Sequence, residues 1–151
     1  YFFLMRKCDS HLDFDIDLAK SASTDNPVYY VQYASARIHS IFKEAASRGI
    51  DMADPEKVDF SVLVTEEEKA LVKCLARFPE EILKAANELA PHIIVYYVYD
   101  LAKAFHSFYN AHRVLGEERP LTDARLLLVR AVQIVLLNVL QLLKINAPEA
   151  M

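Results

Sequence analysis

The stretch NPVYYVQYASARIHS, residues 26–40, combines a helix start with apolar side chains at helical spacing. Pro27 suits the first turn of a helix, because the N–H that proline lacks has no partner there. Gly49 suits the position just after a helix, where the backbone turns left-handed. We therefore expect a helix from Pro27 to about Arg48.

The two sides of this helix differ in chemistry. At 100° per residue, one seam of side chains repeats at i, i+4 and is expected to face the core. That seam consists of Tyr30, Ala34, Ile38, Ile41 and Ala45. The flank beside it presents Tyr29, Tyr33, Arg37 and Ser40. The flanking rings are therefore expected to point away from the core.

Helix signals recur after residue 64. Thr65 and Glu68 form a capping box, in which each side chain satisfies a free backbone N–H of the other residue. The helix that starts there is expected to end near Phe78, because Pro79 opens the next helix.

The last third of the chain contains two long helices. Pro91 opens the first of them, which we expect to close at Gly116, and Thr122 is predicted to cap the second, over residues 123–144. The sequence contains only two glycines, which disfavours turn-dense β architectures. The predicted fold is all-α, a bundle of about five helices.

The final helix is apolar enough to raise the question of a membrane span. Its polar residues fall within one arc of about 140° on the helical wheel. They are Arg130, Gln133, Asn138, Gln141 and Lys144. A polar stripe and a charge inside the run predict an amphipathic core helix, so no membrane contact is expected.

Two segments fall outside the helical pattern. Residues 11–18 alternate polar and apolar side chains, which predicts an extended, half-buried segment. Residues 50–64 are rich in acids and are predicted to be a mobile connector.

Composition and charge limit the possible functions. The chain has 151 residues, 54% of them hydrophobic, enough for one domain with a sizeable core. Its net charge of −4 argues against non-specific binding to nucleic acid, which depends on neutralised phosphates. A local basic patch is still compatible with this balance.

The cysteines and the N-terminal residues bear on the cellular compartment of the protein. Cys8 and Cys74 are too few and too far apart for a disulfide framework or a zinc site, so a reducing, cytoplasmic setting is expected. Cys74 is predicted to fill the core. The apolar start is too short for a signal peptide, and Tyr1 is expected to mark a cut into a larger protein.

The helix after Pro91 also has a distinct outer face. Its expected buried stripe is Ile94, Tyr97, Leu101, Phe105 and Phe108. The opposite face presents Tyr96, Tyr99, Lys103, His106 and Asn110, with Arg113 at its edge. Rings between cationic and amide groups suit unstacked RNA bases, although tyrosines also commonly seal the rim of a core.

Metal sites are not predicted. The acids at 13, 15 and 17 resemble the start of a calcium loop, but Leu18 and Thr24 stand where glycine and a bidentate glutamate are needed. The five histidines lack zinc-hydrolase spacing. The wheel places His112 on the buried side and His106 on the polar side, where it could contact a phosphate or a base.

Three segments in order resemble the C-terminal part of bacterial arginyl-tRNA synthetases, over nearly the whole chain. The first runs from YFFLMRKCDSHLDFDIDLAK to QYASARI, the second is YVYDLAKAFHSFYNAHRVL, and the third is DARLLLVRAVQIVLLNVLQLLKINAPEAM. The resemblance implies a helical anticodon-binding domain at residues 27–151, with residues 1–26 as the junction to a catalytic domain. It also implies that the parent ligase uses ATP and Mg²⁺, whereas this chain has no cofactor and no catalytic residue of its own.

The resemblance also suggests which residues contact RNA. It implies anticodon-loop contacts by Gln32 and Tyr33, then by Tyr99, Asn110 and Met151. Together with the wheel, it suggests stacking by Tyr29, phosphate contacts by Arg37, Lys103 and Arg113, and a further contact by His106. The partner implied is the anticodon loop of tRNA(Arg), bound by a monomer.

Two positions depart from the family pattern. Lys144 stands where related enzymes often have glycine, and Ala150 stands where arginine is common, which weakens an ionic role for the tail. A helical protein-interaction module with tyrosines as interface anchors is the alternative function. An enzyme acting alone is disfavoured, because the chain lacks the signature motifs His-Ile-Gly-His and Lys-Met-Ser-Lys-Ser.

Overall fold

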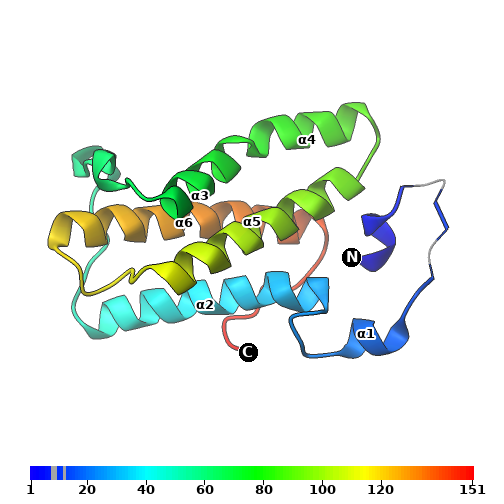
Figure 1. The fold of residues 1–151 in the computed structure, drawn as a ribbon, viewed down its shortest axis with the longest axis horizontal. Helices are drawn as coiled ribbons and strands as arrows, with labels where there is room; N and C mark the ends of the chain where they lie inside the picture. Colours follow the sequence, from blue (N-terminus) through cyan, green and yellow to red (C-terminus); the bar gives the residue numbers. More distant parts are fainter. Residues whose placement is uncertain (8–9, 12) are drawn as a thin grey trace.

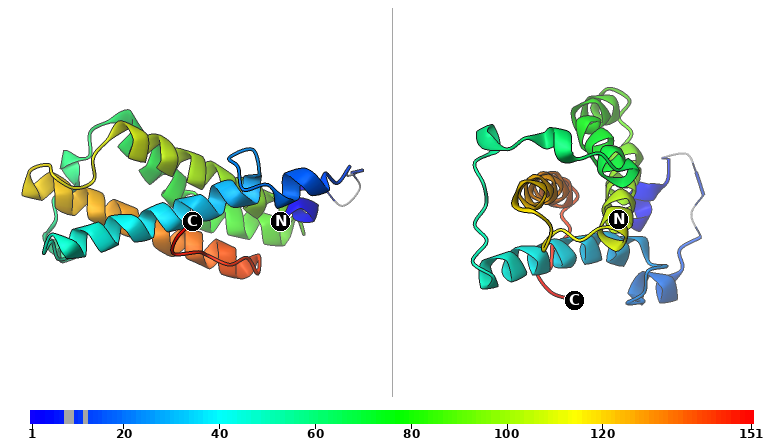
Figure 2. Two further views of the ribbon diagram at one scale, coloured as in Figure 1. Left: turned by 90° about the horizontal axis from the view of Figure 1, so that it is seen from below. Right: turned by 60° about the vertical axis from the view of Figure 1, so that its left-hand side comes forward.

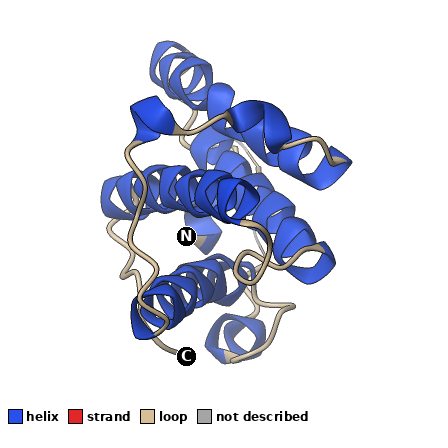
Figure 3. Cartoon of the chain, turned by 90° about the vertical axis from the view of Figure 1, so that its left-hand side faces the viewer, coloured by secondary structure: helices blue, strands red, loops and turns tan. Residues whose placement is uncertain are grey.

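The computed structural model describes residues 1–7, 10, 11 and 13–151, and these residues form helices and loops without a strand (Figure 3). The predicted all-α class is therefore confirmed. The helical elements are η1 (Phe2–Met5), α1 (Ile16–Lys20), α2 (Pro27–Ser47), η2 (Pro55–Lys57), η3 (Phe60–Val62), α3 (Glu66–Ala76), α4 (Phe78–Asn87), α5 (His92–Ala111) and α6 (Arg119–Leu142).

Four helices surround the core. α2 packs on α5, α5 on α3, α3 on α6, and α6 on α2, while α4 adds to the outer side of α5 (Figures 1 and 2). The predicted core stripe of α5 is buried, as is the seam of α2 apart from half-buried Tyr30. The largest fully buried side chains include Tyr97, Phe105, Phe108, Ile38, Leu71 and Leu101.

The predicted starts of α2 and α3 are confirmed. Asn26 caps α2, because its Oδ1 accepts hydrogen bonds from the amides of Val28 (3.1 Å) and Tyr29 (3.4 Å). Gly49 follows α2 with φ +66°. Both hydrogen bonds of the capping box between Thr65 and Glu68 are present.

The prediction of an extended, half-buried segment at residues 11–18 is wrong for its described part. Asp15 caps α1 by accepting a 2.9 Å hydrogen bond from the amide of Leu18, so the segment turns helical at Ile16. Phe14 instead stacks on Phe3, with 5.1 Å between ring centroids. Residues 13–17 are all exposed, so the alternation does not mark a half-buried face; Leu12, like Cys8, lies outside the described residues.

Two boundaries around residue 116 also differ from prediction. α5 ends at Ala111 rather than near Gly116, and His112 is extended. α6 begins at Arg119 with Pro120 in its first turn, so Thr122 lies inside the helix rather than at its cap. The buried Thr122 hydroxyl donates to the carbonyl of Glu117 at 3.1 Å. Proline at the helix start therefore outweighs threonine as the boundary signal.

The helix α6 and the connector complete the bundle. α6 is long and apolar enough to cross a membrane by length and composition, but 56% of its most apolar window is buried against the other helices. Of its predicted polar stripe, Gln133 is buried and the other members are exposed. The connector at 50–64 was predicted to be mobile; it contains the capped turns η2 and η3, and η3 packs on α6.

Two helices end on non-glycine residues with left-handed backbone. Leu89 follows α4 with φ +51°, and Lys144 follows α6 with φ +56°. At each end, the next amide bonds back to the last turn: Ala90 N to Ala85 O, and Ile145 N to Leu140 O, both at 2.9 Å. Both helices therefore end in the motif that normally selects glycine.

Candidate nucleic-acid interface

Two tyrosines one turn apart on α2 stack on each other. The rings of Tyr29 and Tyr33 are nearly parallel, at 17°, with centroids 6.4 Å apart, and both are half-buried. Asn26 sets their position, since its amide caps α2 and its Nδ2 also donates to the carbonyls of Ala19 and Ser21. The flanking position predicted for these rings is confirmed, because both residues are partly exposed to solvent rather than buried.

Arg37 holds the second of these rings in place. Its Nη2 donates to the Tyr33 hydroxyl at 3.1 Å, and its Nη1 donates to Asn110 Oδ1 at 3.1 Å. The guanidinium carbon lies 4.5 Å from the Tyr33 ring centroid and 4.7 Å from that of Tyr109. A planar cation between two rings is a stable arrangement. We call Tyr29, Tyr33, Arg37, Tyr109 and Asn110 the tyrosine surface.

His106 lies beneath the tyrosine surface, and its predicted outward position is wrong. Its side chain is buried, with 5% of the residue exposed. Nε2 is 3.2 Å from the Tyr30 carbonyl oxygen, which can only accept, so Nε2 carries the proton and Nδ1 faces Arg37 Nη1 at 3.5 Å. Burial lowers the pKa of His106, and the charge of Arg37 lowers it further. A neutral imidazole thus supports Tyr30 and Arg37 from below.

His112 is more exposed than His106, the reverse of what the helical wheel predicts. It is half-buried, and its Nε2 lies 3.0 Å from Glu67 Oε2 on α3. This contact lowers the pKa of Glu67. The hydrogen bond predicted for His112 is present and its side chain is only 18% exposed, so the wheel was wrong about the side of His106 alone. The reason is that α2 covers the face of α5 that carries His106.

Gln32 connects the tyrosine helix to the C-terminal tail. Its Nε2 donates to the carbonyl of Asn146 at 2.9 Å, so the tail passes beside α2 (Figures 1 and 2). Met151, at the end of this tail, is half-exposed. This hydrogen bond uses one of the two N–H donors of the Gln32 amide and leaves its other donor and its carbonyl oxygen available.

Tyr99 lies beside the tyrosine surface rather than within it. The centroids of the Tyr99 and Tyr30 rings are 5.4 Å apart. Burial is the main cause that raises the pKa of Tyr30, and the neighbouring Tyr99 raises it further. Tyr99 also lines a hollow of about 670 Å³ together with Phe14 and Asp100. It is therefore connected to Tyr33 through Tyr30 and His106.

The two remaining cations lie apart from Arg37. Lys103 is exposed and lines a shallow hollow towards α3, together with Glu66 and Glu67. Arg113 is exposed at the far end of the α2–α5 seam, in a hollow of about 600 Å³ that Arg48 also lines. Tyr109 of the tyrosine surface lines the same hollow as Arg113, so Arg113 lies at one edge of that surface, whereas the hollow that Lys103 lines contains none of its members.

Sequence reasoning missed Tyr109 and misjudged Tyr30. Tyr109 stands next to Asn110 and three residues after His106 on α5, and this spacing could have identified it as a neighbour of the outer face. Tyr30 was assigned to the core seam, but it is half-buried and its carbonyl holds His106.

Residues that could hold a metal ion do not cluster in the described part of the chain. No group of three or more His, Cys, Asp or Glu side chains there could hold a metal ion. Cys74 is buried as predicted, and burial raises the pKa of its thiol.

The chain is similar to known proteins over its whole length. It is 55% identical to an arginine–tRNA ligase of Desulforudis audaxviator and 52% identical to one of Carboxydothermus hydrogenoformans, in each case over 100% of this chain and 27% of the relative. Among solved structures, arginyl-tRNA synthetase of Thermus thermophilus matches with a TM-score of 0.82 and 35% identity, over 99% of this chain and 25% of that one. The chain thus spans about a quarter of the length of these relatives.

One family accounts for most of the chain. Residues 31–151 match the DALR anticodon binding domain, and this region contains Tyr33, Arg37 and the whole of α5 and α6. The protein belongs to the DALR anticodon binding domain family.

Proposed function

We propose that this chain is the anticodon-binding domain of an arginine–tRNA ligase and that the tyrosine surface binds the anticodon loop of tRNA(Arg). Residues 27–151 form the binding domain and residues 1–26 the junction with the catalytic domain. That catalytic domain would bind ATP and Mg²⁺ and attach arginine in the cytoplasm. This chain holds the far end of the tRNA as a monomer.

The stacked pair of Tyr29 and Tyr33 is the observation that best supports this function. Its rings are already nearly parallel, both residues are half-buried, and Arg37 fixes Tyr33 by a hydrogen bond and a cation–π contact. An unstacked base gains about 1–3 kcal/mol by stacking on such a ring. Since the ring is positioned before binding, little conformational entropy is lost on association.

The other proposed contacts follow from position. Asn110 within the tyrosine surface, Tyr99 beside it, and Met151 at the end of the tail would meet bases or sugars. Gln32 would contact the anticodon loop next to the C-terminal tail, to which it is hydrogen-bonded. Lys103 and Arg113 would meet phosphates farther along the stem. Buried His106 acts by supporting Arg37 rather than by touching RNA.

Fluorescence anisotropy with a labelled anticodon stem-loop of tRNA(Arg) tests the proposal. We expect tighter binding than to a stem-loop for another amino acid, and Tyr33→Ala should weaken binding about 5- to 150-fold, the equivalent of about 1–3 kcal/mol. Tyr96→Ala, which removes an exposed ring from another part of α5, is the control.

Equal and salt-insensitive signals for both RNAs would contradict the proposal and favour a protein-interaction module. An unchanged affinity of the Tyr33→Ala variant would remove Tyr33 from the site even if the domain binds RNA.

A further inference from the structure

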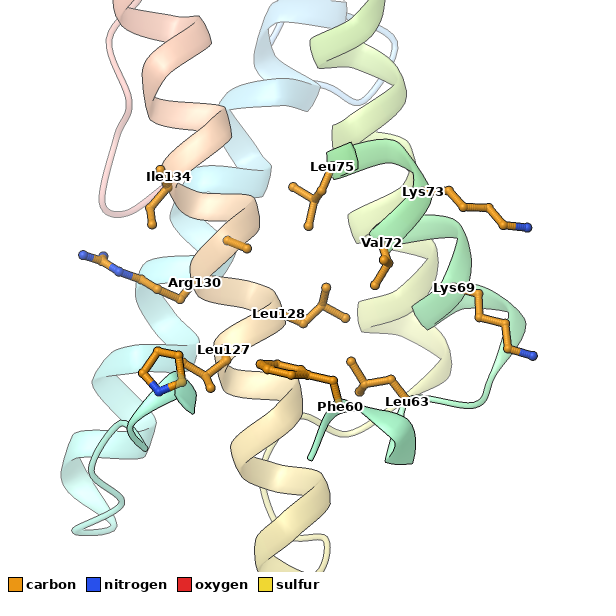
Figure 4. Close-up of a pocket in the computed structure, with 12 residues that line it drawn as sticks. Phe60, Leu63, Lys69, Val72, Lys73, Leu75, Leu127, Leu128, Arg130 and Ile134 are labelled. Atoms are coloured by element: carbon orange, nitrogen blue, oxygen red, sulfur yellow. The ribbon is translucent and has the colours of Figure 1, made fainter. Parts of the chain in front are cut away.

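The seam between α3 and α6 contains an apolar groove on the side of the bundle opposite the tyrosine surface. α3 has 11 residues and α6 has 24, so α3 covers only part of its neighbour. The turns η2 and η3 border the remaining part (Figure 4). The groove has a volume of about 650 Å³. The groove therefore lies where α3 leaves part of α6 uncovered.

The floor of the groove is made of hydrocarbon side chains. Three of them keep much of their surface in water: Phe60 is 45% exposed, Val72 45% and Ile134 48%. They come from η3, α3 and α6, and Figure 4 shows them around one hollow together with Leu63 and Leu128. Single exposed apolar residues are common on protein surfaces, but several that line one hollow offer a surface on which apolar side chains of a partner can pack.

Positive charges occupy both edges of this floor. Lys69 and Lys73 project from the α3 edge and Arg130 from the α6 edge (Figure 4). None of the residues that line the groove is acidic, although the chain as a whole carries a net charge of −4. Lys69 pairs with Glu66 at 3.3 Å on the surface, a contact of little energy. The groove therefore combines an apolar floor with cationic edges.

We propose that the α3–α6 groove binds an amphipathic helix of a partner protein, with leucine-type side chains on one face and acidic side chains along both edges. On α6 the floor extends from Leu127 to Ile134, about 10 Å at 1.5 Å per residue. That length matches about two turns of a bound helix, with anchors at i, i+3 or i+4, and i+7. The acids would face Lys69, Lys73 and Arg130 and accelerate association. This inference is independent of the proposed RNA function.

Two other occupants fit the groove less well. A second copy related by a two-fold axis would place the cationic edges of one groove against those of the other, which is repulsive. An RNA strand would use the cations but leave the apolar floor without a matching surface. The groove and the tyrosine surface lie on opposite seams of the bundle, so both could be occupied together.

Two synthetic helical peptides of roughly fifteen residues, about four turns, test the proposal. Both carry leucines at i, i+4, i+7 and i+11; one has glutamates on the flanks and the other has lysines. By fluorescence anisotropy, we expect the 151-residue chain to bind the glutamate peptide at least about tenfold more tightly than the lysine peptide.

Variants at exposed groove positions separate the contributions of floor and edges. Ile134→Glu and, on the other wall, Val72→Glu should each weaken binding of the glutamate peptide by about tenfold or more. Lys73→Glu combined with Arg130→Glu should shift the preference towards the lysine peptide. Leu142→Glu is the matched control, because Leu142 is 60% exposed on the same helix but lies outside the groove. Circular dichroism melting confirms that each variant is folded.

Three results would overturn the proposal. The first is equal binding, or no binding, of the two peptides. The second is displacement of the bound peptide by the anticodon stem-loop, which would assign the groove to RNA. The third is concentration-dependent dimerisation in sedimentation experiments that Ile134→Glu abolishes, which would assign the groove to a second copy of the chain.

Discussion

Arg125 on α6 and Glu68 on α3 form an ion pair inside the bundle, with Nε 2.8 Å from Oε1. The residues are 5% and 0% exposed. Burial alone would raise the pKa of Glu68, but the Thr65 amide and Arg125 donate hydrogen bonds that hold this pKa below its usual range. Arg125 also donates to the carbonyl of Arg113 at 2.7 Å. One side chain therefore connects α3, α6 and the segment after α5.

Arg125→Ala should lower the free energy of unfolding by about 3–5 kcal/mol, because it leaves the Glu68 carboxylate buried without its counter-ion. Urea denaturation measures this loss. Arg48→Ala breaks the exposed pair with Glu44 and should cost about 0.3–0.5 kcal/mol. Similar losses for the two variants would show that the interior pair contributes no more than a surface pair.

His106→Gln should alter how stability depends on pH. The folded pKa of His106 lies below its ordinary value of 6.5 because burial disfavours the imidazolium. As pH falls below 6.5, His106 becomes protonated in the unfolded chain while it stays neutral in the folded chain. The folded state therefore loses stability relative to the unfolded state until the pH reaches the lowered folded pKa. Urea denaturation at a pH on each side of 6.5 should show a smaller drop in the variant than in the parent. His11→Gln, at an exposed histidine, is the control; an identical drop in all three proteins would contradict the prediction.

Lys144→Gly should stabilise the protein, by about 0.5–1 kcal/mol, because glycine adopts φ +56° without the steric penalty of a side chain. Leu89→Gly, at φ +51°, should act in the same direction. Thermal unfolding followed by circular dichroism measures both effects. Lys43→Gly, within α2, should instead cost about 1 kcal/mol. A lower melting temperature for both turn variants would refute the argument from backbone conformation.

Arg37 and Tyr33 should be energetically coupled in RNA binding. Arg37→Lys loses the planar contact with two rings, and Tyr33→Phe loses the hydroxyl that accepts from Nη2. A double-mutant cycle on binding of the anticodon stem-loop should give a coupling energy of at least about 0.5 kcal/mol. Asn138→Ala, at an exposed position on α6, serves as the control partner for each variant. Strictly additive effects of the first two changes would remove Arg37 as a positioning residue.

Most of the fold could be predicted from the sequence because its signals are local. Pro27, Gly49 and the capping box at Thr65 and Glu68 act within one turn of the backbone, and each was confirmed. Prediction was wrong where two local signals competed, as with Pro120 and Thr122 at the start of α6. The turns at Leu89 and Lys144 carry no glycine, so this chain gives no direct sign of their left-handed backbone.

The site was less predictable, because a helical wheel gives direction and omits the neighbouring helices. It placed Tyr33 and Arg37 correctly on a flank of α2. It could not show that α2 approaches α5 over His106, nor that Tyr109 lies across from Arg37. Those contacts join residues about 70 positions apart in the chain, and only the packed structure reveals them.

The hydrogen bond from Gln32 to Asn146 has a practical consequence for labelling. Only five residues follow Asn146, and at about 3.4 Å each they reach at most about 17 Å from that anchor. An affinity tag or fluorophore attached after Met151 would therefore begin close to the stacked rings and, under the proposed function, would compete with RNA for the same space. A label on the exposed tip between α4 and α5 would avoid this interference.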